Sequence, residues 1–458
     1  MQEPQEPRRA PISPPGAGRG AEAETSGQPG RGKDAARVAE HLFRNEAGKL
    51  VSVLTRMFGI ERLQLAEDVV QEALIRAMQT WPYYGVPENP AAWITQTAKN
   101  LALDVLRREQ NFRRKEPGIV AFMDQWPVGA PAEREVVFDT EIGDDRLRMM
   151  FACCHPVLPP DARVALALKT LCGLGTREIA AAFLANEAAI AKRLTRARKA
   201  IRDAGVPFEI PHGEELEGRL ESVEQTLYLL FNEGYKASSG DALLREDLCR
   251  EAIRLVELLA EHPVGDRPRT HALAALMYLN AARFPERQGG EGRLLRLQDQ
   301  DRGNWDGSLI ARGMRHLARA AAGDRFSAYH IQAGIAACHA VAPSYEATDW
   351  AQILALYDAW AAMDESPVIA LNRAVAVANV HGAEAGMAAV EAIANGKPLD
   401  GYYLRHAVLG EFEWRLGNFA SARAQFERAA ALSAVESERA FLAGRAAACG
   451  DGDVTEIV

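Results

Sequence analysis

The chain has 458 residues, 48% of them hydrophobic, and a formal net charge of −9. This length suggests about three domains. No apolar run approaches the roughly 18 residues of a membrane span, and residues 1–32 lack the apolar core of a signal peptide, which argues against membrane and exported proteins. The acidic balance argues against a chain that binds nucleic acid over its whole surface.

The chain divides into five predicted segments. Residues 1–33, rich in Pro, Gly, Ala and Glu, are expected to form a disordered tail. A first helical module covers 34–114, a linker with several prolines covers 115–139, and a second helical module covers 140–205. A helical extension occupies 214–458. Apolar residues recur at intervals of three and four residues, and they do not alternate with polar residues as they would in a strand. The predicted fold class is therefore all-α.

In the first module, residues 66–79 predict an amphipathic helix. Its apolar face carries Val70, Ala73, Leu74, Ala77 and Met78. Asp68, Gln71 and Glu72 lie on the other face. Two carboxylates at positions i and i+4 repel each other, so the presence of both suggests a basic partner surface. Taken alone, however, this helix is better explained by ordinary solvation of the two carboxylates.

The next predicted helix runs from Pro90 to Arg108. Its inward residues are Ile94, Ala98, Leu101 and Val105, and its other side carries Trp93, Asn100, Arg107 and Arg108. An exposed Trp beside an amide and guanidinium groups suits unpaired bases, through stacking, edge hydrogen bonds and phosphate contacts. The stretch 81–84, Trp-Pro-Tyr-Tyr, is expected to add aromatic residues in a loop, and core packing is the alternative for each ring.

The second module contains a predicted helix-turn-helix. Thr176 is expected to cap the first helix, a break falls at Leu184-Ala185, and Asn186 caps the second helix. On the second helix Ile190, Leu194, Ala197 and Ile201 share the buried face. The opposite face and its flank carry the cations Lys192, Arg193, Arg196 and Lys199. A helix that is apolar on one side and cationic on the other can read a major groove, whereas the alternative is a solvated helix without a role.

No chemistry-bearing cluster points to an enzyme. The six cysteines form no C-x-x-C pair, and Cys153-Cys154-His155 is better explained by small thiols on a buried helix than by zinc. The extension offers Glu233, Asp299 and Asp301, but no metal-spaced pair, nucleophile elbow or phosphate loop. We therefore expect no catalytic residue, no metal and no cofactor, and the thiols suit a reduced, cytoplasmic setting.

Near its end, the extension has the small and aromatic spacing of a tetratricopeptide helix pair. Leu409-Gly410 is followed by Trp414, Phe419, Ala422 and Phe426, and a fainter copy begins near 371. We expect a tetratricopeptide-like part near 368–448.

Taken together, these motifs resemble the extracytoplasmic-function type of sigma-70-family RNA polymerase sigma factors. Asp68-Val-Val-Gln-Glu72 is similar to the region 2 motif that grips the polymerase. The Pro90–Arg108 helix resembles the segment that reads the −10 element, and Ile190–Arg198 resembles the region 4 helix that reads the −35 element. Leu184, Ala188-Ala189 and Ala191 depart from the family pattern, which leaves the −35 sequence preference open.

The extension resembles that of one sigma-factor branch. The similar segments are Phe-Asn-Glu-Gly-Tyr at 231–235, Leu-Gln-Asp-Gln-Asp-Arg at 297–302 and Ala-Leu-Asn-Arg-Ala at 370–374. This resemblance implies binding to core RNA polymerase and promoter DNA, and an extension that contacts the sigma modules, the polymerase or a small regulatory protein. Two alternatives are a stand-alone helix-turn-helix regulator with a helical sensor and a helical-repeat scaffold that binds no DNA.

Overall fold

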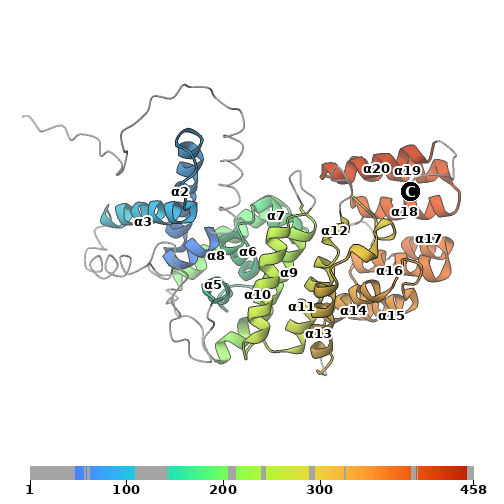
Figure 1. The fold of residues 1–458 in the computed structure, drawn as a ribbon, viewed down its shortest axis with the longest axis horizontal. Coiled ribbons are helices and arrows are strands. Elements are labelled where there is room, and N and C mark those ends of the chain that lie inside the picture. Colours follow the sequence, from blue (N-terminus) through green and yellow to red (C-terminus); the bar gives the residue numbers. More distant parts are fainter. Residues whose placement is uncertain are drawn as a thin grey trace, which may run out of the picture.

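The computed structural model describes residues 47–55, 58, 62–108, 142, 144–204, 213–238, 244–287, 294–323, 326–393, 399 and 401–450. Within these ranges the regular elements are helices, which confirms the predicted all-α class. The predicted tail 1–33 and linker 115–139 lie outside the described residues. The helices follow one another along the long axis of the molecule, from α2 and α3 at one end to α18–α20 at the other (Figure 1).

The first module consists of a helical segment at 47–55, then α2 (Leu63–Tyr84) and α3 (Pro90–Arg108). Val70, Ala73, Leu74 and Ala77 are buried as predicted, but Met78 is 49% exposed. The predicted loop at 81–84 is wrong, because α2 continues to Tyr84 with Pro82 inside it. Pro82 has no N–H to donate to the Met78 carbonyl, and α2 ends two residues later.

The second module consists of four short helices. These are α5 (Asp145–Cys153), α6 (Pro160–Leu171), α7 (Thr176–Ala182) and α8 (Glu187–Asp203). Asp144 caps α5 by accepting a hydrogen bond from the Leu147 amide at 2.9 Å. Helix α6 is buried along most of its length, which makes it the centre of this module.

The extension begins with long helices and ends in helical hairpins. Its first part contains α9 (Glu214–Tyr235), α10 (Glu246–Glu261), α11 (Pro268–Ala281), α12 (Phe284–Arg287), the 3₁₀ turns η4 (Leu297–Asp299) and η5 (Arg302–Asn304), and α13 (Gly307–Ala320). Its second part contains α14 (Ala328–Val341), α15 (Trp350–Met363), α16 (Pro367–His381), α17 (Ala383–Glu391), α18 (Tyr403–Arg415), α19 (Phe419–Leu432) and α20 (Glu436–Ala448).

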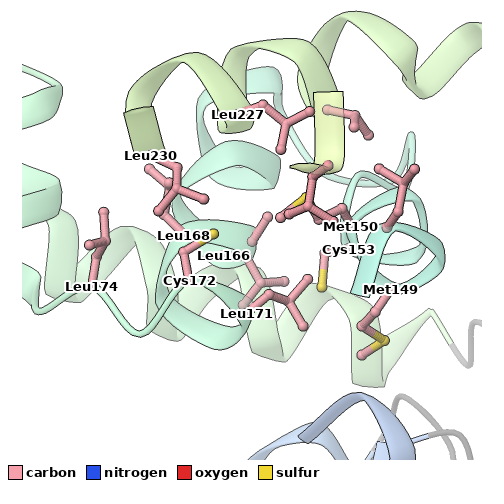
Figure 2. Close-up of a cluster of buried hydrophobic side chains, with 14 of the residues drawn as sticks. Met149, Met150, Cys153, Leu166, Leu168, Leu171, Cys172, Leu174, Leu227 and Leu230 are labelled. Atoms are coloured by element: carbon pink, nitrogen blue, oxygen red, sulfur yellow. The ribbon is translucent and has the colours of Figure 1, made fainter. Parts of the chain in front are cut away.

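The second module and the extension share one hydrophobic core. Figure 2 shows Met150 of α5 and Leu168 of α6 facing Leu227 and Leu230 of α9, and all four side chains are almost fully buried. The hydrophobic cluster that contains them runs from Leu50 in the first module to Tyr329 in the extension. Helix α9 therefore completes the core of the second module instead of starting a separate unit.

Close packing of small and aromatic residues joins α18 to α19. A Cβ on Gly410 would lie 2.9 Å from ring carbons of Phe426, so only glycine allows this approach. Ala422, Phe426 and Ala429 are buried, and Trp414 meets Phe419 edge to face at 5.2 Å. The spacing seen in the sequence thus packs a helix pair, while its tetratricopeptide-like character remains a prediction.

Candidate nucleic-acid and polymerase interface

Helix α8 forms because its first turn is capped and one of its faces is apolar. The Asn186 side chain accepts a hydrogen bond from the Ala189 amide at 2.8 Å, which confirms the predicted cap. Ile190, Leu194, Ala197 and Ile201 are at most 3% exposed, so the predicted buried face is also confirmed. This packing fixes which side chains of α8 point into solvent.

The exposed face of α8 carries Lys192, Arg196 and Lys199. Positions i, i+4 and i+7 fall on one stripe of a helix. Arg193 differs, because its guanidinium lies 5.1 Å from the Phe183 ring centroid and 3.5 Å from Asp161. Three of the four predicted cations therefore form a stripe that can meet phosphates or base edges, and the fourth is partly held by its own module.

The turn between α7 and α8 differs from the prediction in its capping. Helix α7 begins at Thr176 with Gly175 as its cap residue, and the Gly175 amide donates to Glu178 at 2.6 Å. The Thr176 hydroxyl instead donates to Glu187 at 2.7 Å, which ties the two helices together. Leu184 holds a φ of 49° and is 80% exposed. The break thus falls where it was expected.

A buried ion pair connects α8 to the first module. Arg198 Nη2 lies 2.7 Å from the Glu67 carboxylate on α2, and the Thr170 hydroxyl donates to the other Glu67 oxygen at 2.6 Å. The backbone of Gly48 in the first module also packs tightly on the end of α6, because a Cβ on Gly48 would lie only 2.2 Å from the Leu171 carbonyl oxygen. At 100° per residue Arg198 lies well away from the Lys192 stripe, so this contact leaves the stripe open.

The predicted base-reading face of α3 is only partly exposed. Trp93 is half-buried and meets the buried Trp81 ring edge to face at 5.7 Å. Asn100 is exposed and accepts a hydrogen bond from Gln96 at 3.0 Å. The side chains of Arg107 and Arg108 lie outside the described residues. The expectation of an exposed Trp93 is thus met only in part, because the ring also packs on the core.

Among the described aromatic residues of this module, the two tyrosines at the end of α2 are the most exposed. Tyr83 and Tyr84 are 85% and 87% exposed, whereas Trp81 is 2% exposed. Exposed rings next to a nucleic-acid site can stack on unpaired bases. Of the four residues 81–84, only these two rings are available for stacking.

The acidic face of α2 is exposed at Asp68, Gln71 and Glu72. Glu72 pairs with Arg76 at 2.9 Å, and Asp68 accepts from Gln64 at 2.8 Å. Arg76 offsets the expected repulsion between the two carboxylates, which the spacing argument overlooked. Exposed pairs of this kind contribute little stability, so a partner can exchange them at small cost.

Buried charges tie the helix-turn-helix to the extension. Arg245, which precedes α10, pairs with Glu178 of α7 at 2.5 Å and with Glu233 of α9 at 3.3 Å. The Gly234 carbonyl accepts from the Arg245 amide at 2.7 Å, and a Cβ on Gly234 would lie 2.7 Å from Cys249 Sγ. Within the segment 231–235, Glu233 therefore serves as an ion-pair partner of Arg245, and Gly234 allows the close approach of Cys249.

The cysteines of the second module are core residues. Burial raises the pKa of the Cys154 and Cys172 thiols to about 12, and burial lowers the pKa of His155. Thiols held in the protonated form are poor metal ligands. Among the described residues, no group of three or more His, Cys, Asp or Glu could hold a metal ion. Within the same ranges, no helix is both long and apolar enough to cross a bilayer.

Comparison with protein families identifies three segments. Residues 42–112 match sigma-70 region 2, residues 148–201 match sigma-70 region 4, and residues 219–321 match a family of unknown function, DUF6596. The first two matches contain the acidic face of α2 and the cationic stripe of α8. The third covers most of α9 through α13, including the residues that contact the second module.

Among known proteins, the chain is 39% identical to an uncharacterized protein of Rhizobium meliloti over 393 residues, which cover 86% of this chain and 91% of that protein. It is 27% identical to the ECF RNA polymerase sigma factor SigE of Mycolicibacterium smegmatis, over 36% of this chain and 60% of SigE. It is 31% identical to the probable RNA polymerase sigma factor RfaY of Xanthomonas campestris, over 30% of this chain and 33% of RfaY.

No solved structure matches this chain. The match to the Rhizobium protein spans nearly the full length of both chains, and the two sigma-70 matches cover the modules described above. The chain therefore belongs to the same family as the Rhizobium protein, and it carries segments that match sigma-70 region 2, sigma-70 region 4 and DUF6596 in that order.

Proposed function

We propose that this chain is a sigma factor that binds core RNA polymerase and directs promoter recognition and DNA melting in the cytoplasm. The observation that carries the proposal is the exposed stripe Lys192, Arg196 and Lys199 on a capped helix within a region 4 match. The named sigma factors among its relatives support it. The chain supplies binding surfaces, and no step of bond chemistry is assigned to it.

Three surfaces have separate proposed roles. The exposed Asp68, Gln71 and Glu72 face of α2 binds a basic surface of the polymerase. The Lys192–Lys199 stripe, with Arg193 at its flank, meets the upstream promoter element. Trp93, Asn100, Arg107 and Arg108, together with Tyr83 and Tyr84, hold melted bases of the downstream element. The acidic net charge of −9 opposes unselective binding of the free protein to DNA.

The extension has a proposed regulatory part. It contacts the helix-turn-helix through Arg245 and shares its core through α9. A partner that binds the extension, such as a small regulatory protein, could therefore act on region 4 directly. Sequence resemblance suggested this role, and the contacts on α7 support it.

The polymerase surface is tested by binding to core enzyme. Asp68→Ala/Glu72→Ala should abolish co-purification of the chain with core polymerase, because it removes the acidic face without touching the buried side of α2. Arg76→Ala on the same helix is the matched control. It frees Glu72 from its pair, so binding should stay equal or become tighter. If Arg76→Ala lost polymerase binding while Asp68→Ala/Glu72→Ala kept it, the acidic face would not be the polymerase-binding surface.

The DNA surface is tested by run-off transcription from a promoter library with core polymerase. The triple variant Lys192→Ala/Arg196→Ala/Lys199→Ala should lose defined start sites and lower the salt slope of promoter binding by about three. Arg250→Ala on α10, which removes an exposed cation elsewhere, should change neither. Specific duplex binding without polymerase would favour the stand-alone regulator, and no binding or transcription at all would favour the scaffold.

A further inference from the structure

Three arginines of the extension gather where two of the family-like segments meet. Arg283 lies between α11 and α12, Arg287 ends α12, and Arg302 begins η5. Arg283 and Arg302 lie 5.4 Å and 5.1 Å from the Trp305 ring centroid. Arg287 lies 4.1 Å from the ring centroid of Tyr235, the last residue of the segment 231–235. Aromatic faces stabilise cations without neutralising their charge.

These arginines have no carboxylate partner within ion-pair distance among the residues that the structure describes, unlike Arg245, Arg254 and Arg445 of the same extension. Arg302 holds the end of α14, donating to the carbonyls of His339 and Ala342 and to the Thr348 hydroxyl. Among the described residues, Arg283 makes one long hydrogen bond, 3.3 Å to Gln300, and Arg287 Nη2 donates to the Tyr235 carbonyl at 3.1 Å. A guanidinium has five N–H donors, so most donors of Arg283 stay available.

Buried polar atoms without partners surround the same cluster. Within the described residues, Arg287 Nε, Trp305 Nε1 and His339 Nδ1 are buried and make no hydrogen bond. Leaving such an atom unpaired costs about 1–3 kcal/mol, and a missing ligand is one explanation for it. Burial, together with the charges of Arg283 and Arg302, lowers the pKa of His339 to about 3, so His339 adds no further charge.

The cluster is partly exposed to solvent. Arg283 and Arg287 are only half-buried, and so is Tyr235. Burial and the neighbouring Arg287 lower the pKa of Arg283, although the nearby Tyr235 raises it. Concentrating like charges in a half-buried position is unfavourable unless an anion offsets them, because the lower dielectric strengthens repulsion.

We propose that Arg283 and Arg287 bind an oxyanion, the phosphate or carboxylate group of a small ligand, beside Trp305 and Tyr235. Guanidinium groups suit this role because they hold carboxylate and phosphate through paired, charge-assisted hydrogen bonds. Arg302 is the positioning residue, since it fixes η5 and the end of α14. Through this site the extension would bind a small molecule independently of DNA and polymerase.

The test measures binding of inorganic phosphate and of succinate to the full-length chain by calorimetry, against chloride at equal ionic strength. One of the two anions should bind. Binding of phosphate would indicate a phosphate ligand, and binding of succinate would indicate a carboxylate ligand. Arg283→Gln should weaken that binding by about tenfold or more, the effect of losing a charge-assisted hydrogen bond. Arg423→Gln removes an exposed arginine already paired with Glu427, so it should leave the dissociation constant unchanged.

Two further measurements keep the result unambiguous. Arg283→Lys retains the charge but loses the paired geometry, so a folded Arg283→Lys protein with weakened binding supports the site even where Arg283→Gln unfolds. A crystal soaked in tungstate should show the anion beside Arg283 and Arg287. Equal binding by wild type and both Arg283 variants would mean an adventitious ion only and would overturn the proposal. Failure of both anions to bind more tightly than chloride would overturn it as well.

Discussion

Leu184 shows how one residue can strain the turn that precedes α8. Leu184 departs from the family pattern at this position, and its φ of 49° is the left-handed conformation that glycine favours. Residues with a Cβ adopt this conformation at a cost of roughly 1–2 kcal/mol. Since the side chain is 80% exposed, packing offsets little of that cost.

Leu184→Gly should therefore stabilise the protein. Relief of strain outweighs the extra freedom of glycine in the unfolded chain, which costs roughly 0.4–1 kcal/mol, so the free energy of unfolding should rise by about 0.5–1 kcal/mol. Urea denaturation measures it. Leu184→Ala keeps the strained backbone and should show no such gain. A Leu184→Gly protein less stable than wild type would mean that the exposed leucine has a packing role.

Between elements, α10 holds α5 through a half-buried carboxylate. Glu251 of α10 lies 2.6 Å from Arg146 of α5 and 2.7 Å from Arg254. Burial alone would raise the pKa of Glu251, but hydrogen bonds from Arg254 and the charge of Arg146 outweigh it and lower the pKa from 4.5 to about 2. The carboxylate thus favours the folded state in its charged form.

This lowered pKa predicts how stability depends on pH. Because the folded pKa is below the unfolded one, the contribution of Glu251 is fully present above pH 4.5 and is lost as the pH falls towards 2. The lowering corresponds to roughly 3 kcal/mol. Glu251→Gln should flatten this part of the stability curve between pH 2 and 4.5, measured by denaturation at each pH. Glu427→Gln, in an exposed pair, should leave the curve as in wild type.

For the whole molecule, the shared core makes region 4 dependent on the extension. A chain ending at residue 210 lacks Leu227 and Leu230, which cover Met150 and Leu168. Each lost leucine contact costs about 1.5–3 kcal/mol, a large part of the roughly 5–15 kcal/mol that stabilises a typical domain. The truncated chain should melt without a cooperative transition and bind a hydrophobic dye.

A chain that ends at residue 342, after α14, is the comparison for this truncation. It retains the α9 contacts and should melt cooperatively. Cooperative melting of the shorter chain would show that region 4 folds alone. The same two chains help to interpret transcription assays. If the shorter chain is inactive, the reason would be that it is unfolded, and not that it has lost an activating extension.

The local pattern of the sequence predicted the parts of this molecule that depend on near neighbours. The all-α class, the buried face of α8 and the Asn186 cap rest on residues within one or two turns. The loop at 81–84 was predicted wrongly because Pro82 and the tyrosines have loop-like character, while burial of Trp81 extends the helix. Glu67 gave no signal, since its partners Arg198 and Thr170 are far along the chain. The polymerase and DNA surfaces remain predictions.

The position of α9 also has a consequence for synthesis on the ribosome. Helix α8 leaves the ribosome before the helices that support its module, because α9 and α10 follow it in the chain. At roughly 5–20 residues per second, several seconds pass between the two events. During that interval the stripe of α8 has no completed core beneath it. We therefore expect the second module of a nascent chain to complete its fold only after much of the extension has been translated.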